Sequence, residues 1–328
     1  MCTYVLGIDI AQDTFDVALR NGEDVCGTGH FDNCDTGFES LRRWLENRQV
    51  ESLHACMEAT SRYGIALATF LHAHGYDVSI VNPSRIYNYG RSQLSRTKTD
   101  KADALLIADF CVTQTPSLWE PTSDFHTELQ ALTRYLNDLK TTRTQEKTRL
   151  RSNIPSHSVN NAIEDHIGYL NKQIEQVEQE IRELLKQDDE HREKVKLLTS
   201  IPGIGLITAA KFLAEVPDVS AFPQARQLAA FAGLCPTEHR SGTSVRKKSR
   251  LSKTGSKRLR TMFFMSALNV KKNGNPLISP LIDRMEKEGR ADKIIIGAIM
   301  RNLLHIAYGV LKTGKPFDPK YLSGPIGA

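Results

Sequence analysis

The chain has 328 residues, enough for two domains at the usual ~150 residues each, and its 40% hydrophobic and 25% charged residues exclude the disordered and fibrous classes. The sequence has no CxxC pair, no HExxH motif and no run near the ~20 apolar residues that span a bilayer, so we expect a cytoplasmic protein with neither a zinc site, a disulfide framework nor a membrane span. The formal charge of +5 divides into −8 over residues 1–198 and +13 over residues 199–328, which indicates that the two parts meet different partners.

Residues 4–31 predict three short strands, because the segments YVLGIDI, TFDVALR and VCGTGHF are separated by polar or glycine-containing turns. We expect Asp35 or Thr36 to cap the next helix. Its apolar residues fall on one face at helical spacing: Phe38, Leu41, Trp44 and Leu45. The following segments are a strand at 52–58, a helix that stops at Gly75, a strand at 77–83 and two helices that reach about Thr113. This order predicts a mixed sheet with helices packed against it.

From about Phe125 to Leu197 the strand signals disappear and a helical repeat replaces them. Apolar residues recur with 4-3 spacing over three heptads, the pattern of a coiled-coil seam: Ile163, Ile167, Leu170, Ile174, Val177, Ile181 and Leu184. The same spacing occurs upstream of a break near 153–155: Leu129, Leu132, Leu136 and Leu139. We expect an antiparallel helical hairpin or arm. The alternatives are two helices packed on the domain core, or a seam used for self-association.

The part beyond Ser200 is basic and opens with SIPGIGLITAAKFLAEV, which resembles a helix-hairpin-helix element. Its hairpin contains Gly203 and Gly205, which would let backbone N–H groups at a helix N-terminus approach a phosphate. A plain turn between two helices is the alternative. From 239 to 282 no acidic side chain occurs among eleven basic ones, and we expect nine of these to bind nucleic acid: Arg240, Arg246, Lys247, Lys248, Arg250, Lys253, Lys257, Arg258 and Arg260. A solvated basic face is the other interpretation of this stretch.

Four acidic residues stand at places where the predicted elements end or begin. Asp9 lies inside the apolar strand VLGIDI, and Glu58 ends the strand LHACME. Asp100 and Asp103 lie three apart at the start of a helix, so their side chains project from one face. Carboxylates on adjacent element ends repel one another unless a cation lies between them, and hard oxygen ligands suit Mg²⁺ or Mn²⁺. Taken singly, Asp100 could only cap its helix and Asp9 could only accept backbone hydrogen bonds.

These residues carry a resemblance to a known family. The first 120 or so positions resemble the RNase H fold in its RuvC-like form, with a DEDD tetrad matched by Asp9, Glu58, Asp100 and Asp103. The whole chain resembles the DEDD insertion-sequence transposases of the IS one-ten family. The C-terminal domain of that family is matched by SIPGIG at 200–205, by AAFAGLCPTEHRSGTSVRKKSRLSKTGSKRLR at 229–260 and by IIIGAIMRNLLHIAYGVLKTGKPFD at 294–318.

The resemblance implies an α/β domain followed by helical parts: a RuvC-like catalytic domain at 1–122, a helical hairpin or coiled coil at 123–197, and a basic transposase domain at 198–328. It implies a site in which the four acids hold one or two Mg²⁺ ions, with Mn²⁺ as the alternative. It also implies that Ser241, in HRSGTSVRKK, attacks DNA and becomes covalently joined to it. From the residues alone, Thr243, Ser244 and Ser249 are equal candidates.

The function that follows is a transposase or recombinase that moves an insertion sequence by cleaving and exchanging DNA strands. The resemblance further implies double-stranded donor and target DNA as partners, a structured guide RNA called the bridge RNA, a homodimer or homotetramer, and a place on the nucleoid. Two alternatives stay open. One is a hydrolytic, junction-resolving nuclease in which metal-bound water attacks; the other is a non-catalytic nucleic-acid-binding regulator whose acids are structural.

Overall fold

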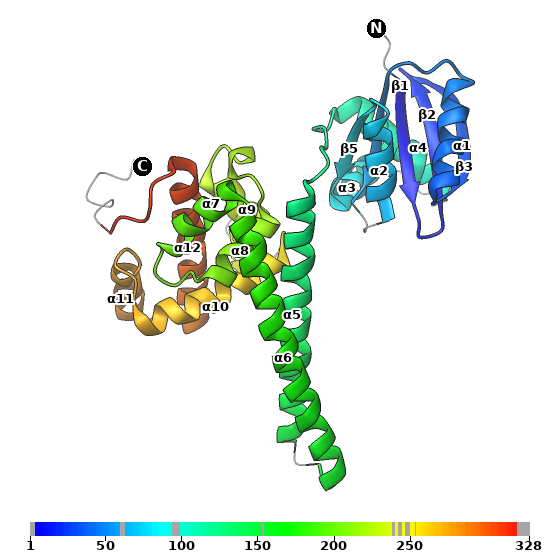
Figure 1. Cartoon of the computed structure of the whole chain (residues 1–328). Helices are drawn as coiled ribbons and strands as arrows, with labels where there is room; N and C mark the ends of the chain where they lie inside the picture. Colours follow the sequence, from blue (N-terminus) through cyan, green and yellow to red (C-terminus); the bar gives the residue numbers. More distant parts are fainter. Residues whose placement is uncertain are drawn as a thin grey trace. The chain divides into compact units, whose positions relative to one another are not determined.

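The computed structural model describes residues 4–59, 63–93, 99–152, 154–237, 240–241, 245–246, 250–252 and 254–319. The chain divides into two compact units, residues 1–122 and residues 123–328. Figure 1 shows both units.

The N-terminal unit is built on one five-stranded mixed sheet. Its strands are β1 (Tyr4–Ile10), β2 (Thr14–Asn21), β3 (Asp24–Asp32), β4 (Leu53–Glu58) and β5 (Asp77–Val81). The spatial order is β3-β2-β1-β4-β5. The first three strands form an antiparallel meander, whereas β4 runs parallel to β1 and β5 parallel to β4. The prediction of a mixed sheet is confirmed, and the arrangement is consistent with an RNase H-like domain.

Helices cover both faces of this sheet (Figure 1). They are α1 (Asp35–Glu46), α2 (Tyr63–Ala73), α3 (Pro83–Ser92) and α4 (Asp100–Gln114). Leu6 and Ile8 of β1 pack in one core cluster with α1 and α2, whereas Val5 packs in another with α3 and α4. Since successive side chains of a strand point to opposite faces, the odd-numbered residues of β1 face α4.

The start of α1 differs from the prediction. Cys34, not Asp35 or Thr36, occupies the N-cap position, and its side chain makes no capping hydrogen bond. The backbone of Cys34 is extended, at φ −151° and ψ 170°, whereas Asp35 is already the first helical residue. The apolar face of the helix is as expected, because Phe38, Leu41 and Leu45 are buried.

The C-terminal unit is mainly helical. Its helices are α5 (Asp124–Arg151), α6 (His157–Gln187), α7 (Asp189–Thr199), α8 (Leu206–Glu215), η1 (Val219–Ala221), α9 (Ala225–Phe231), α10 (Lys257–Asn273), α11 (Ser279–Lys287) and α12 (Asp292–Thr313). Two short antiparallel pairs lie between α9 and α10: β6 (Pro236–Thr237) with β9 (Arg250–Leu251), and β7 (Arg240–Ser241) with β8 (Val245–Arg246).

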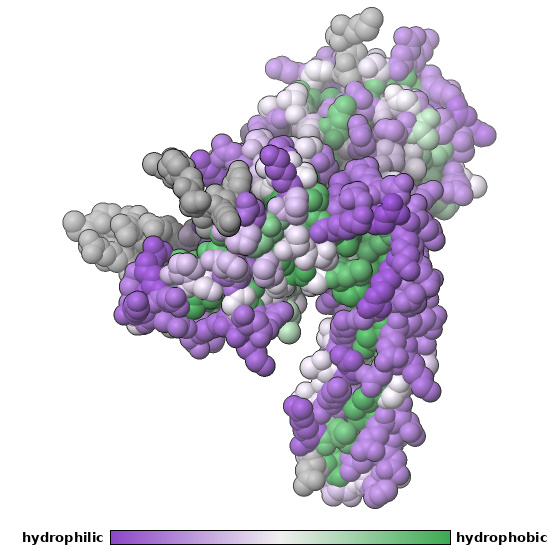
Figure 2. Space-filling view, turned by 60° about the vertical axis from the view of Figure 1, so that its left-hand side comes forward, coloured by the Kyte–Doolittle hydropathy of each residue, from purple (hydrophilic) through white to green (hydrophobic). Residues whose placement is uncertain are grey.

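Helices α5 and α6 pack side by side as a long hairpin (Figure 1). Most of the predicted seam of α6 is buried, although Ile167 and Leu184 are only partly so and Leu185 is buried instead. In Figure 2 hydrophobic residues follow the junction of the two helices, while hydrophilic residues cover their outer sides. Leu129 and Leu136 of α5 also belong to the core that α8, α10 and α12 share. The hairpin therefore also packs on the domain core, and a coiled-coil geometry stays a prediction.

Helix α12 corrects one expectation. By length and composition alone it is long and apolar enough to cross a membrane, which we did not expect of any segment. More than half of its apolar window is buried inside the unit, and Ile299, Leu303 and Leu304 are fully buried. Its hydrophobicity is therefore explained as that of a core helix.

Candidate functional site

Helix α4 packs directly on β1, and Gly7 makes this close approach possible. A Cβ atom at Gly7 would lie 2.1 Å from the carbonyl oxygen of Ala104 and 2.4 Å from the amide nitrogen of Ala108. No side chain fits between backbone atoms at these distances. The close approach of α4 to β1 therefore lies one to two turns after the first residue of the helix, at Ala104 and Ala108.

This packing places three of the four predicted acids on the same side of the sheet. Asp9 follows Gly7 by two residues on β1, so it points to the same face of the sheet, and it is half-buried there. Asp100 and Asp103 lie in the first turn of α4. Thr99 caps this helix, because its side chain accepts a hydrogen bond from the amide of Ala102 at 3.2 Å. The interpretation that Asp100 serves only as the cap is therefore wrong.

The neighbouring carboxylates affect the charge state of Asp9. The pKa of Asp9 is raised from 3.8 to about 6, mainly by burial and then by the negative charges of Asp103, Asp100 and Asp16, in that order. A hydrogen bond from the backbone amide of Ile10 acts in the opposite direction and is too weak to cancel them. Asp9 thus lies among like charges whose effect the Ile10 amide offsets only in part.

Glu58 lies on the neighbouring strand at the same level. It follows Met57, which pairs with Ile8 in the parallel register of β4 and β1. By alternation along β4 it points to the same face as Cys56, which packs in the core cluster with Ile107 of α4. Glu58 is partly buried. The topology therefore places the fourth acid on the face that α4 covers.

The donor set suits a hard divalent cation. All four groups are carboxylates, which Mg²⁺ and Mn²⁺ prefer, and their mutual repulsion would fall when a cation lies between them. Among the residues that the structure describes, no three carboxylate, histidine or cysteine side chains converge closely enough to form a metal site as they stand. The chemistry of the residues fits a divalent ion, whereas their present side-chain positions do not yet enclose one.

A fifth acid, missed by the sequence analysis, lies beside this group. Asp16 of β2 is directly opposite Asp9 in the antiparallel register and is only 7% exposed. Its Oδ2 lies 2.9 Å from Nδ1 of His30 on β3. The sequence contains a signal for Asp16, because TFDVAL has an acid inside an apolar strand, as GIDI has at Asp9.

The second predicted region lies in the C-terminal unit. Ser241 is the last residue of β7, opposite Val245. Arg240 pairs with Arg246 across the same ladder, and Arg250 pairs with Thr237 in the other. Several predicted residues lie outside the described part of the chain: Lys247, Lys248 and Lys253, together with the alternative nucleophiles Thr243, Ser244 and Ser249. Which hydroxyl reacts therefore stays a prediction.

The start of α10 holds the other basic residues. Lys257 and Arg258 are exposed in its first turn, after the capping residue Ser256. Arg260 instead donates to the carbonyl oxygens of Ala232 at 3.1 Å and Gly255 at 3.0 Å. This guanidinium joins two segments of its own unit, which is a structural role beside the binding role expected for it.

The predicted hairpin between two helices is present as the turn between α7 and α8. Gly203 has φ +100°, and a Cβ there would lie 2.4 Å from Cγ2 of Val270 on α10. Gly205 has an ordinary φ of −91° at the N-cap of α8, with open space where a Cβ would stand. Gly203 is thus needed for packing, whereas Gly205 leaves room for a ligand at the helix N-terminus.

Two family models match this chain, and the first match extends from the N-terminal unit into α6 of the C-terminal unit. Residues 6–159 match the family model of the DEDD transposases of IS110 type, described as a transposase. Residues 195–281 match the model described as transposase of the IS116/IS110/IS902 family. The two matches cover the parts of the chain that contain the acids and Ser241.

Relatives extend the similarity to the full length. The pilin gene-inverting protein of Moraxella bovis is 38% identical over 97% of this chain and 98% of its own. The transposase for insertion sequence element IS1111A of Coxiella burnetii is 25% identical over 80% of this chain and 76% of its own. Three findings agree: the two family matches, the similarity to the Moraxella bovis protein over 97% of the chain, and the acidic face, by which we mean Asp9, Glu58, Asp100 and Asp103. We conclude that the chain belongs to the IS110 family of DEDD insertion-sequence transposases.

Proposed function

We propose that the protein is a DNA recombinase that moves an insertion sequence by cleaving DNA strands, holding them through Ser241, and rejoining them to new partners. The observation that carries this proposal is the gathering of Asp9, Asp100 and Asp103 on one face of the sheet. A buried apolar strand would not retain an acid among like charges for stability alone.

The four acids are proposed to hold one or two Mg²⁺ ions, with Mn²⁺ as the alternative. When bound, such an ion would favour ionisation of an attacking hydroxyl and neutralise charge on the phosphate. Asp9, Glu58, Asp100 and Asp103 would bind and orient it, and the charge of Asp16, opposite Asp9 on the neighbouring strand, would add to the attraction for a cation. Phosphoryl transfer needs positioning and charge stabilisation more than covalent help from the protein.

Ser241 is proposed as the nucleophile. Its Oγ would attack the phosphorus, forming an Oγ–P bond while the bond from phosphorus to the deoxyribose oxygen breaks and that oxygen leaves with a proton. Reversal with a different strand's hydroxyl would rejoin DNA and free the serine. Arg240 and Arg246, whose backbones pair across β7 and β8, would hold the phosphate in place.

The partners proposed are donor and target DNA, a structured guide RNA, and further copies of the chain as a dimer or tetramer. Base pairing by the RNA would read sequence, while the basic segments would hold backbones. The similarity to a protein named for pilin gene inversion favours reciprocal exchange between two DNA sites. Such a protein would act on the nucleoid, in the cytoplasm.

The decisive experiment is a search for a covalent protein–DNA adduct. The protein is incubated with labelled element-end duplex, Mg²⁺ and RNA transcribed from the flanking element, and products are resolved under denaturing conditions. We expect an adduct that mass spectrometry maps to Ser241. Ser241→Ala should lose the adduct and strand exchange, while Ser244→Ala, a neighbouring serine, should retain both.

The outcomes distinguish the rivals. Cleavage that persists in Ser241→Ala, with no adduct in the parent protein, would establish the hydrolytic nuclease. Recombination that is intact in Asp9→Asn would support the non-catalytic regulator. A requirement for the RNA is tested by omitting it or by scrambling its loops.

A further inference from the structure

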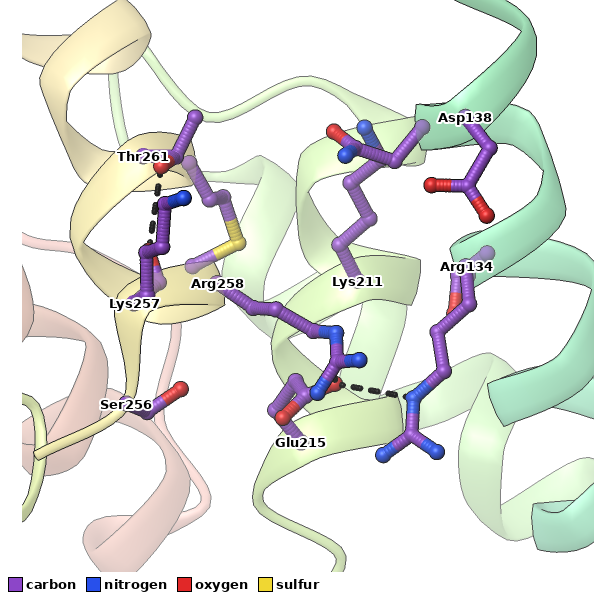
Figure 3. A pocket seen from close by; sticks show the side chains of 11 residues that line it. Arg134, Asp138, Lys211, Glu215, Ser256, Lys257, Arg258 and Thr261 are labelled. Atoms are coloured by element: carbon purple, nitrogen blue, oxygen red, sulfur yellow. Dashed lines mark hydrogen bonds and ion pairs between the residues drawn. The ribbon is translucent and has the colours of Figure 1, made fainter.

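A cavity of about 440 Å³ lies within the C-terminal unit, between α5, α8 and the first turn of α10 (Figure 3). Side chains from all three helices line it: Thr133, Arg134, Asn137, Asp138, Lys211, Glu215, Ser256, Lys257, Arg258, Thr261 and Met262. Two of its cations, on α5 and α8, are outside the basic stretch that the sequence predicted to bind nucleic acid.

The cations outnumber the acids around this space. Four basic side chains, Arg134, Lys211, Lys257 and Arg258, face two carboxylates. One of these, Glu215, is only 14% exposed and already serves both guanidinium groups: its Oε1 lies 3.5 Å from Nε of Arg134 and 3.8 Å from Nε of Arg258. In the described part of the chain, neither ammonium group has a carboxylate at ion-pair distance.

These positive charges stand where the fold disfavours them. Lys211 is half-buried, and burial together with the charge of Lys140 lowers its pKa below the usual range, although Glu178 partly offsets this. Lys257 and Arg258 are the first two residues of α10, at the positive end of the helix dipole, and no acid occurs in that turn. A bound anion would relieve both kinds of repulsion.

We propose that this cavity binds a phosphate of the nucleic-acid backbone, with Lys211 and Lys257 as its main ligands and Glu215 as the residue that orients Arg134 and Arg258. The ammonium groups would contact phosphate oxygens as point charges, and the guanidinium groups would hold the adjacent part of the backbone. The inference rests on the proposed function, since the polyanion that a recombinase must hold is DNA or its guide RNA.

Binding is measured by fluorescence anisotropy with labelled duplex DNA, single-stranded DNA and RNA of equal length, in EDTA, from 50 to 300 mM NaCl. Lys211→Gln and Lys257→Gln are compared with Lys293→Gln. Lys293 is the matched control, because it is an exposed lysine in the first turn of α12 and does not line the cavity. All three variants lose one positive charge, so that only location differs. Circular dichroism and thermal melts check that each variant folds.

We expect each cavity variant to raise the Kd about 5- to 10-fold at 150 mM NaCl, and to reduce the salt slope by about 0.9 for duplex DNA or about 0.7 for a single strand. The control should change the Kd less than about 2-fold. The Kd of the double variant Lys211→Gln/Lys257→Gln should rise by less than the product of the two single increases, because both lysines bind the same phosphate. The nucleic acid whose slope changes identifies the ligand.

Parent-like slopes in both cavity variants, or losses equal to that of Lys293→Gln, would overturn the proposal. Because binding is measured in EDTA, without cleavage, these results are independent of Ser241 and of the acids. If the cavity variants bind like the control while the Ser241 adduct forms, this inference alone is refuted. If the cavity variants lose binding as expected but no Ser241 adduct forms, the proposed chemistry alone is refuted.

Discussion

The acidic face of the N-terminal unit and the basic cavity of the C-terminal unit repeat one arrangement with opposite sign. In the first, Asp9 is half-buried among Asp16, Asp100 and Asp103, and its pKa is raised. In the second, Lys211 is half-buried near other cations, and its pKa is lowered. Each unit therefore places charges of one sign together at some cost in stability. The difference teaches what each is suited to hold: a divalent cation in the first unit and a phosphate in the second.

The largest expected effect is on chemistry in the acidic face. Asp103→Asn should reduce the rate of strand cleavage at least ~10³-fold, while the Kd for nucleic acid stays within about 2-fold of the parent value. The reason is that loss of a metal ligand affects the reaction and not the binding of the nucleic-acid backbone. Asp13→Asn, an exposed acid in the β1–β2 turn, is the control and should cleave normally. Equal loss of binding and cleavage would end the separation of roles between the two units.

A second prediction tests the packing that assembles the acidic face. Gly7→Ala should lower the free energy of unfolding of the protein by about 3 kcal/mol or more, since its Cβ would overlap backbone atoms of α4. Chemical denaturation measures this. Gly64→Ala is a milder comparison, because its Cβ would meet side-chain atoms and no backbone: Sδ of Met57 at 3.1 Å and Cδ1 of Ile10 at 3.6 Å. An unchanged stability in Gly7→Ala would show that α4 does not lie on β1 as described.

A third prediction separates the two glycines of the hairpin between α7 and α8. Gly203→Ala should cost about 2 kcal/mol, because φ +100° is strained for alanine and Val270 occupies the space. Gly205→Ala should be close to neutral in stability, since its φ is ordinary and nothing lies within 4 Å. Thermal unfolding of the two variants measures the difference, and equal effects would contradict the assigned packing role.

The smallest expected effect concerns stability without metal. Since the folded-state pKa of Asp9 is about 6, above the ordinary value of 3.8 for an aspartate, the stability of the protein should fall as pH rises between about 4 and 6. Asp9→Asn removes this loss and should be more stable by on the order of 1 kcal/mol at pH 7, once solvent screening is allowed for.

In Mg²⁺ the parent protein should be more stable than Asp9→Asn, because metal binding stabilises the folded parent protein and not the variant. Thermal melts at pH 4, 5 and 7, with EDTA and with Mg²⁺, measure both parts. A parent protein that is as stable as the variant in EDTA at pH 7 would show that the acids do not repel one another in the folded chain.

Local pattern was sufficient for much of this molecule. The segment YVLGIDI and its neighbours, separated by polar or glycine-containing turns, predicted the strands of the meander, and the helical spacing of Phe38, Leu41 and Leu45 predicted the buried face of α1. These predictions succeed because turn residues and helical periodicity are properties of a single segment of the chain. The predicted N-cap of α1 was wrong, since Cys34 has the extended conformation that we expected of Asp35 or Thr36.

The sequence also identified each acid of the site singly, because a charged residue is unexpected inside an apolar strand and calls for an explanation. The tertiary structure determines which acids are neighbours, because Asp9 and Asp103 lie on the same side of the sheet only when α4 packs on β1 at Gly7. Asp16 joined them through the antiparallel register, and the cavity combined Arg134, Lys211 and Lys257 from helices far apart in the chain. Residue types and periods are properties of one segment, whereas the field that each charge experiences is set by its neighbours in space. Only the folded chain determines that field.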